Sequence, residues 1–261
     1  MNKLNDLSPS EWIHWTKTCW LTDYPVDSTF CVRKELKTTK SPQAMRDIIS
    51  FFTKEGDRVL DTFAGVGSTL IGALLCGREA VGIELDERHC QIFDQIKSTF
   101  ILKGGTLVPT LNKVEGQMWA STRMINDDCI ARLPRLAKDS ADLVLCDPPH
   151  GPQGYHAKEG LGSSKTTEEF VDNMAKLGEG VREVLRDGKY WVIIMGDRYQ
   201  DGEYVPLTYM LATKMQECGF KLKGIKVWIN QVTQKNLKAY RVGESFVPNI
   251  VHENLIILRK E

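Results

Sequence analysis

The tetrapeptide Asp147-Pro148-Pro149-His150 holds the residue types in this sequence that could most directly do chemistry. Two consecutive prolines stiffen the backbone and remove two amide donors, so the carbonyls here become fixed acceptors beside the Asp147 carboxylate. An amino group on an aromatic ring is a poor nucleophile because its lone pair is delocalised. Acceptors that bind both of its hydrogens localise that pair, so positioning and electrostatics could carry a displacement at the nitrogen. A plain Pro-Pro turn with an N-capping aspartate is the alternative interpretation.

A glycine-rich segment over residues 61–69, Asp-Thr-Phe-Ala-Gly-Val-Gly-Ser-Thr, is the second such feature. Gly65 and Gly67 permit a tight turn close to a ligand, and the helix expected after them favours a carboxylate at its N-terminus. The third glycine of a dinucleotide-binding fingerprint is missing. Glu84 ends the next expected strand, where an acid can accept both hydroxyls of a ribose. Together the two features predict a site for a ligand that carries a ribose.

Hydrophobic patterning predicts strands and helices that alternate along the chain. Strands are expected over residues 58–63, 80–85, 124–125, 142–146, 190–195, 221–229 and 254–259. Helices are expected over residues 42–52, with Ser41 as its cap, and over 69–76, 86–100, 167–185 and 206–218. This alternation implies a mostly parallel sheet with helices on both faces, in which ligands bind outside the carboxyl ends of the strands.

The length of 261 residues suits one α/β domain. We expect a single domain over residues 1–261, in which an irregular or short helical arm (1–30) packs on the main body. A first half (31–100) carries the glycine-rich segment, a connection (101–122) follows, and a second half (123–261) carries the tetrapeptide.

Composition narrows the class of protein. No apolar run is long enough to span a bilayer, the N-terminus lacks a signal-peptide pattern, and the seven cysteines include no Cys-x-x-Cys pair. We therefore expect a cytoplasmic protein with no membrane segment, no disulfide framework and no metal. Since 34 basic residues balance 34 acidic ones, any nucleic-acid surface must be local. The best candidate runs from Lys221 to Arg241 and contains no acidic residue, although such a segment could equally keep a sheet edge soluble.

Ser41-Pro42 with its helix, residues 61–69, Glu84 and residues 147–150 together resemble the amino-group DNA methyltransferases of the N6-adenine and N4-cytosine type. In that family the catalytic tetrapeptide is Asp, Asn or Ser, then Pro-Pro, then an aromatic residue. Residues 251–260 also look like its last strand. The likeness covers about residues 30–100 and 122–261. It implies a Rossmann-like class I methyltransferase fold, with a seven-stranded mostly parallel sheet, helices on both faces and an antiparallel last strand.

The resemblance also implies an activity and the residues that carry it. A methyl group would pass from S-adenosylmethionine to an exocyclic amino nitrogen of a DNA base by in-line displacement, N6-adenine being favoured over N4-cytosine. The implied cofactor-binding residues are Lys40, Ser41, Pro42, Asp61, Phe63, Ala64, Gly65, Gly67, Ser68, Thr69, Glu84 and Asp128. Among them Glu84 would bind the ribose and Asp128 the adenine amino group. Asp147, Pro148, Pro149 and His150 would be catalytic, with Asp147 and the Pro148 carbonyl on the target amino group and His150 stacked on the base.

DNA is the expected partner, but the chain offers little room for a recognition surface. Only residues 151–166 and 231–246 could read sequence, and the residues expected to contact nucleic acid are Tyr155, Lys235, Lys238 and Arg241. A duplex would need its target base flipped out, at a cost of a few kcal/mol. A short recognition site, a homodimer that shares the duplex, or a single-stranded substrate would each suit so small a surface. Whether the setting is restriction-modification or an orphan enzyme stays open.

Two departures from the family pattern leave alternatives. His150 replaces the usual Tyr, Phe or Trp and offers less stacking area. The cofactor half also precedes a catalytic half that resembles the class with the reverse order, as if permuted at residues 101–122. A guanine-N2 or adenine-N6 RNA methyltransferase is one alternative, since Gly151 follows the tetrapeptide as it often does there. An inactive methyltransferase-like partner subunit is the other.

Overall fold

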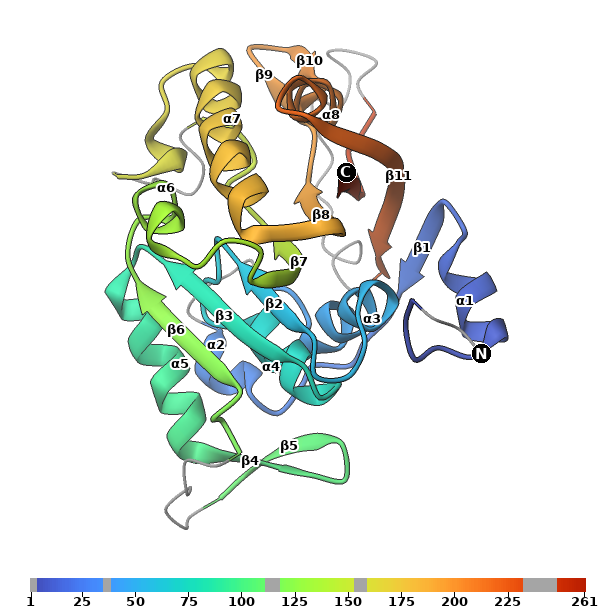
Figure 1. Ribbon diagram of the computed structural model, residues 1–261, viewed down its shortest axis with the longest axis vertical. Coiled ribbons are helices and arrows are strands. Elements are labelled where there is room, and N and C mark those ends of the chain that lie inside the picture. The colour runs from blue at the N-terminus through green and yellow to red at the C-terminus, as the bar shows by residue number, and fades with distance from the viewer. Residues whose placement is uncertain (1–3, 35–38, 111–117, 153–158, 232–247) are drawn as a thin grey trace.

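A computed structural model describes residues 4–34, 39–110, 118–152, 159–231 and 248–261. Eight strands form one sheet in the order β1-β11-β12-β8-β7-β2-β3-β6. Their bounds are β1 Cys19–Thr22, β2 Arg58–Asp61, β3 Glu79–Glu84, β6 Thr122–Asn126, β7 Ala141–Cys146, β8 Leu185–Met195, β11 Phe220–Asn230 and β12 Glu253–Lys260. Figure 1 shows β6, β3 and β2 side by side within this sheet. Strands β6, β3, β2, β7 and β8 pair in parallel, whereas β12 runs antiparallel to both of its neighbours. The mostly parallel sheet and the antiparallel last strand are therefore as predicted.

Helices pack on both faces of this sheet. They are α1 Pro9–Trp15, α2 Phe30–Arg33, α3 Pro42–Phe52, α4 Ser68–Leu75, α5 Glu87–Thr99, α6 Cys129–Arg132, α7 Thr167–Val184 and α8 Leu207–Glu217. Every residue of β7 is buried, as expected for a parallel strand covered on both sides. Leu143 and Leu145 join the core under α3, α4 and α5, whereas Val144 and Cys146 join the core under α7 and α8. The period-two alternation of β7 thus divides the hydrophobic core into two layers.

The N-terminal arm contributes an eighth strand that the sequence pattern did not reveal. Strand β1 pairs in parallel with β11, and Trp20 of β1 stacks on Trp228 with ring centroids 5.1 Å apart. Trp15 stacks against Phe51 of α3 in the same cluster. The expectation of an irregular or short helical arm was therefore incomplete, because a four-residue strand gains its stability from these tertiary contacts and not from its own pattern.

Two hairpins also lie where loops were expected. Strands β4 (Phe100–Lys103) and β5 (Thr106–Pro109) form an antiparallel pair within the 101–122 connection, and β9 (Arg198–Gln200) pairs with β10 (Glu203–Val205). Gly104 and Gly105 both have positive φ, which gives the two-residue turn its fit to the twist of the hairpin. No helix in the described part of the chain has the length and apolar character to cross a membrane.

Several predicted boundaries shift by a few residues. Strand β8 begins at Leu185 instead of residue 190, and β2 ends at Asp61 because the chain turns at the glycine-rich segment. Ser41 precedes α3 as its cap residue, but its hydroxyl contacts the Gln43 side chain and makes no capping bond to the helix backbone. The expectation that this serine caps the helix was wrong. Pro42 at the first helical position is as predicted.

Candidate active site

The carboxyl ends of β2, β3 and β7, with the loop after β6, open onto one cavity of about 870 Å³. Because β2 pairs in parallel with both β3 and β7, the residues that follow these strands meet at one edge of the sheet. The predicted site residues on the cavity wall are Lys40, Asp61, Phe63, Ala64, Gly65, Ser68, Thr69, Glu84, Asp128, Asp147, Pro148, Pro149 and His150. Gly65 and Asp147, which come from different halves of the chain, therefore face the same space.

Three of the predicted cofactor residues are not among those that line the cavity. Gly67 precedes α4 with φ of 87°, and a Cβ atom there would lie 2.2 Å from the Phe93 ring. The Pro42 carbonyl oxygen would lie 2.9 Å from a Cβ on Gly72, where α3 packs closely on α4. Ser41 stands beside it at the start of α3. Gly67 and Ser41-Pro42 thus shape the backbone behind the wall, and their contact with a ligand stays a prediction.

Glu84 is fixed on the cavity wall by the two elements that flank it. One carboxylate oxygen accepts a 2.8 Å hydrogen bond from the Gly65 N–H, and the other accepts a 2.9 Å bond from the Asp86 N–H. His89 Nδ1 lies 3.1 Å from the second oxygen, and its hydrogen bond to Glu84 raises the pKa of His89. The glycine turn and the acid therefore form one unit. No functional role for His89 was predicted from the sequence, although its position five residues after Glu84 in the next helix places it there.

Asp61 is the most deeply buried carboxyl group on the wall, with 3% of its surface exposed. Its Oδ1 accepts a 2.8 Å hydrogen bond from the Phe63 N–H. Burial raises the pKa of Asp61 to about 7, against the lowering effect of hydrogen bonds from Thr69 and Phe63. Within the described residues no basic side chain forms an ion pair with it, so Asp61 is suited to a cationic group on a ligand.

Asp128 has a structural partner as well as a place on the wall. It caps α6, and its Oδ1 accepts a 3.0 Å bond from the Ala131 N–H. Its Oδ2 would lie 3.7 Å from a Cβ on Gly160, next to Leu85. The cap fixes one oxygen, and the second lies near Gly160, which also lines the cavity.

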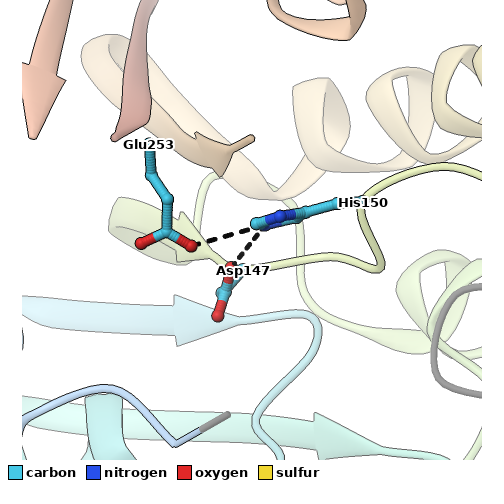
Figure 2. A group of neighbouring side chains, drawn as sticks. All are labelled: Asp147, His150 and Glu253. Atoms are coloured by element: carbon cyan, nitrogen blue, oxygen red, sulfur yellow. Dashed lines mark hydrogen bonds and ion pairs between the residues drawn. The ribbon is translucent and has the colours of Figure 1, made fainter. Parts of the chain in front are cut away.

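Asp147 lies in a cluster of four polar side chains. Lys40 Nζ is 3.2 Å from Asp147 Oδ2 and 2.5 Å from Glu253 Oε1. His150 Nε2 is 3.2 Å from Asp147 Oδ1 and 3.8 Å from Glu253 Oε1. Dashed lines in Figure 2 mark these two contacts of His150. Burial alone would raise the pKa of Asp147, but Lys40 and His150 outweigh it and hold the pKa below its ordinary value. Asp147 is therefore ionised and oriented at neutral pH.

Two members of this cluster were not predicted to lie at the catalytic corner: Lys40 was assigned to the cofactor, and Glu253 was given no role. Lys40 was expected to support the cofactor from the side, whereas its ammonium group contacts two carboxylates. Glu253 was included only in a strand-like ending. Ligand atoms of Asp147, His150 and Glu253 lie within 4.8 Å of one another, a spacing that a metal ion could use. The Lys40 ammonium already contacts two of the three groups, and the expectation of no metal remains a prediction.

The expected nucleic-acid residues Tyr155, Lys235, Lys238 and Arg241 lie outside the described residues. Two lysines of the basic segment before them are engaged within the protein. Lys226 is buried, and its ammonium group lies 4.3 Å from the centroid of the Trp15 ring. Lys221 pairs with Glu261 at 2.8 Å. Lys226 is thus unavailable to phosphate, because its side chain packs against the aromatic cluster of the N-terminal arm.

Comparison with known proteins gives both sequence and structural relatives. Residues 2–95 match the family model described as DNA methylase, N6_N4_Mtase. The type II methyltransferase M.MwoI of Methanothermobacter wolfeii is 27% identical over 41% of this chain and 17% of its own length. M.BglI of Bacillus subtilis is 32% identical over 38% of this chain and 27% of its own length. The alignments thus span about a quarter or less of these relatives. TrmN of Thermus thermophilus, a solved structure, superposes with a TM-score of 0.56 at 18% identity, over 92% of this chain and 55% of that one.

The fold and the site together define a class. The sheet order, the cavity at its carboxyl edge and the likeness to TrmN give the Rossmann-like class I fold of S-adenosylmethionine-dependent methyltransferases, as predicted. Within that class, residues 2–95 are similar to the N6_N4_Mtase DNA methylase family, and parts of the chain are similar to two type II methyltransferases.

Proposed function

We propose that this protein transfers a methyl group to an exocyclic amino nitrogen of a DNA base, with N6-adenine favoured over N4-cytosine. The observation that carries the proposal is the shared cavity, where the acidic glycine turn after β2 and the Asp147-Pro148-Pro149 corner after β7 face each other. When bound, S-adenosylmethionine supplies an electrophilic methyl group on a sulfonium centre. Every other requirement must be met by the residues of this chain.

The cofactor half has groups that fit each part of S-adenosylmethionine. Asp61 is a buried acid suited to the amino group of the methionine part, and the start of α4 with Ser68 and Thr69 is suited to its carboxylate. Glu84 would accept the ribose hydroxyls, and Asp128 would accept from the adenine amino group. Because Gly65 donates to Glu84, one movement of the turn would change both subsites.

The target amino group would bind at the carboxyl end of β7. Asp147 and the Pro148 carbonyl would accept its two hydrogens and localise the nitrogen lone pair. Both prolines lack an N–H, so no backbone donor competes at this corner. The imidazole of His150 would stack on the base while its Nε2 holds Asp147. Positioning of the nitrogen in line with the methyl group would then account for most of the rate.

Incubation with tritiated S-adenosylmethionine and separate DNA and RNA pools, followed by nucleoside analysis, tests this function. We expect label in N6-methyladenine or N4-methylcytosine of DNA. In Asp147→Ala the label should fall by about a hundredfold or more, because a preorganised acceptor is lost, while calorimetry shows cofactor affinity nearly unchanged. Asp172→Asn is the matched control and should keep full activity. Asp172 lies on the surface of α7 and pairs with Lys214 of α8.

Two other outcomes have specific meanings. Label confined to RNA would replace the DNA proposal by an RNA base methyltransferase, for which Gly151 after His150 is the supporting sequence feature. Cofactor binding without transfer to either pool would favour a partner subunit. The fixed Glu84 and the ionised Asp147 argue against that second reading, because a degenerate site has no need of either.

A further inference from the structure

Glu253 reaches the catalytic corner because the last strand is antiparallel. In a parallel sheet only carboxyl ends meet at the ligand edge, but β12 runs the opposite way between β8 and β11 and brings its first residue there. Asn254, the next residue, pairs with Met195 at the end of β8. Glu253 thereby lies beside Asp147, from which it is far away in sequence.

The distances show a competition for one cation. Lys40 Nζ is 2.5 Å from Glu253 Oε1 and 3.2 Å from Asp147 Oδ2, so its shorter contact is with Glu253. All three side chains are largely buried, at 15%, 25% and 26% exposure, where charge pairs are weakly screened. With Lys40 positive and Asp147 and Glu253 negative, these three side chains together carry one net negative charge.

That excess charge has a consequence at a methyl-transfer site. If Lys40 had Asp147 as its only partner, the ammonium group would settle on the carboxylate that must accept the target amino group, and the corner would be neutral. Glu253 draws the ammonium away and leaves one negative charge. A nitrogen that gains a methyl group becomes positive until it loses a proton, so a net negative corner stabilises it.

We propose that Glu253 is a positioning residue of the methyl-transfer site, which holds Lys40 so that the Asp147 carboxylate stays open to the target amino group. The proposal rests on the proposed function and adds a role for the last strand. In the transfer step, the nitrogen lone pair would form the new bond to the methyl carbon and the sulfur would keep the electrons of the broken bond. The nitrogen proton would then pass to solvent.

The first test needs neither cofactor nor nucleic acid. Lys40 acetylation by a limiting amine reagent is measured by mass spectrometry in the wild type, Glu253→Gln and Glu183→Gln. The Glu183 control removes a carboxylate that lies 2.6 Å from Lys138 on the surface of α7. A lost neighbouring carboxylate lowers a lysine pKa by about one unit or more, so Lys40 should react about tenfold faster in Glu253→Gln only. An unchanged Lys40 rate would overturn the proposal even if methyl transfer is confirmed.

The second test uses methyl transfer and a double-mutant cycle. Glu253→Gln should lower kcat at least about tenfold with little change in the KM for S-adenosylmethionine, whereas Glu183→Gln should match the wild type. Adding Lys40→Met to Glu253→Gln restores one net negative charge, so the double variant should be more active than Glu253→Gln. Strictly additive losses, with melting temperatures close to that of the wild type, would refute the competition for Lys40. A wild type that transfers no methyl group while Lys40 reactivity still responds would refute the proposed function and keep the charge arrangement.

Discussion

Asp61 offers a prediction whose sign is opposite to the usual effect of removing a charged group. Its pKa of about 7 lies above the ordinary value of 3.8, because the folded protein buries the carboxyl group. A group whose folded pKa is raised favours the folded state most below its unfolded pKa, and that contribution is lost as the pH rises through the folded pKa. Ionisation of Asp61 should therefore destabilise the cofactor-free protein increasingly from about pH 4 to about pH 7.

The magnitude follows from the two pKa values. Between pH 5 and pH 8 the difference in proton uptake amounts to about 2–3 kcal/mol of unfolding free energy. Asn in place of Asp61 keeps an oxygen that can accept from the Phe63 N–H but cannot ionise. Asp61→Asn should thus gain about 2–3 kcal/mol relative to the wild type as the pH goes from 5 to 8. Its affinity for S-adenosylmethionine at pH 8 should fall by about tenfold or more, since a charge-assisted bond is lost.

Denaturant unfolding of both proteins without cofactor at several pH values measures this, and the titrations of groups distant from Asp61 cancel in the difference. Asp142→Asn is the control of opposite sign. Asp142 is also buried, but its bonds to the Arg58 N–H and Arg186 outweigh burial and lower its pKa. The contribution of Asp142 to the unfolding free energy is present above its unfolded pKa and is lost at lower pH. Asp142→Asn should therefore destabilise the protein at neutral pH. A pH-independent difference between the wild type and Asp61→Asn would refute the reasoning.

Two further predictions concern the same cavity. Glu84→Gln should weaken cofactor binding about tenfold to a hundredfold by calorimetry, because hydrogen bonds to a charged group contribute about 1.5–3 kcal/mol. The amide NH₂ of the glutamine would also oppose the N–H of Gly65 or Asp86. An unchanged affinity would remove Glu84 from the ribose subsite. His150→Phe should lower the KM for DNA, since a phenyl ring stacks over more area, and should lower kcat, since Asp147 loses a donor. A variant with both higher kcat and lower KM would show that His150 only stacks.

The sequence predicted the parts of the site that depend on local rules. A glycine turn or a Pro-Pro corner after a buried strand must lie at the carboxyl edge of a parallel sheet, so Gly65 and Asp147 could be placed together without coordinates. Lys40 and Glu253 could not, since they stand 213 residues apart and meet only because β12 is antiparallel and lies next to β8. Strand β1 was missed for a similar reason, as its pairing with β11 depends on packing between distant tryptophans.

Charge at the cavity constrains how a nucleic acid could approach it. Among the described residues, the wall carries eight acidic side chains and two basic ones, Lys40 and Arg88. The acids are Asp61, Glu84, Asp86, Glu87, Asp127, Asp128, Asp147 and Glu159. Such a wall attracts a sulfonium cofactor and repels phosphate. A DNA substrate must therefore present its base to Asp147 while its backbone stays outside the cavity. That is the geometry of a flipped base or a single strand, whose extra cost of a few kcal/mol must be recovered by contacts with phosphate beyond the cavity. A salt dependence of KM with unchanged kcat would follow, because ions would screen the backbone contacts and leave the buried corner unaffected.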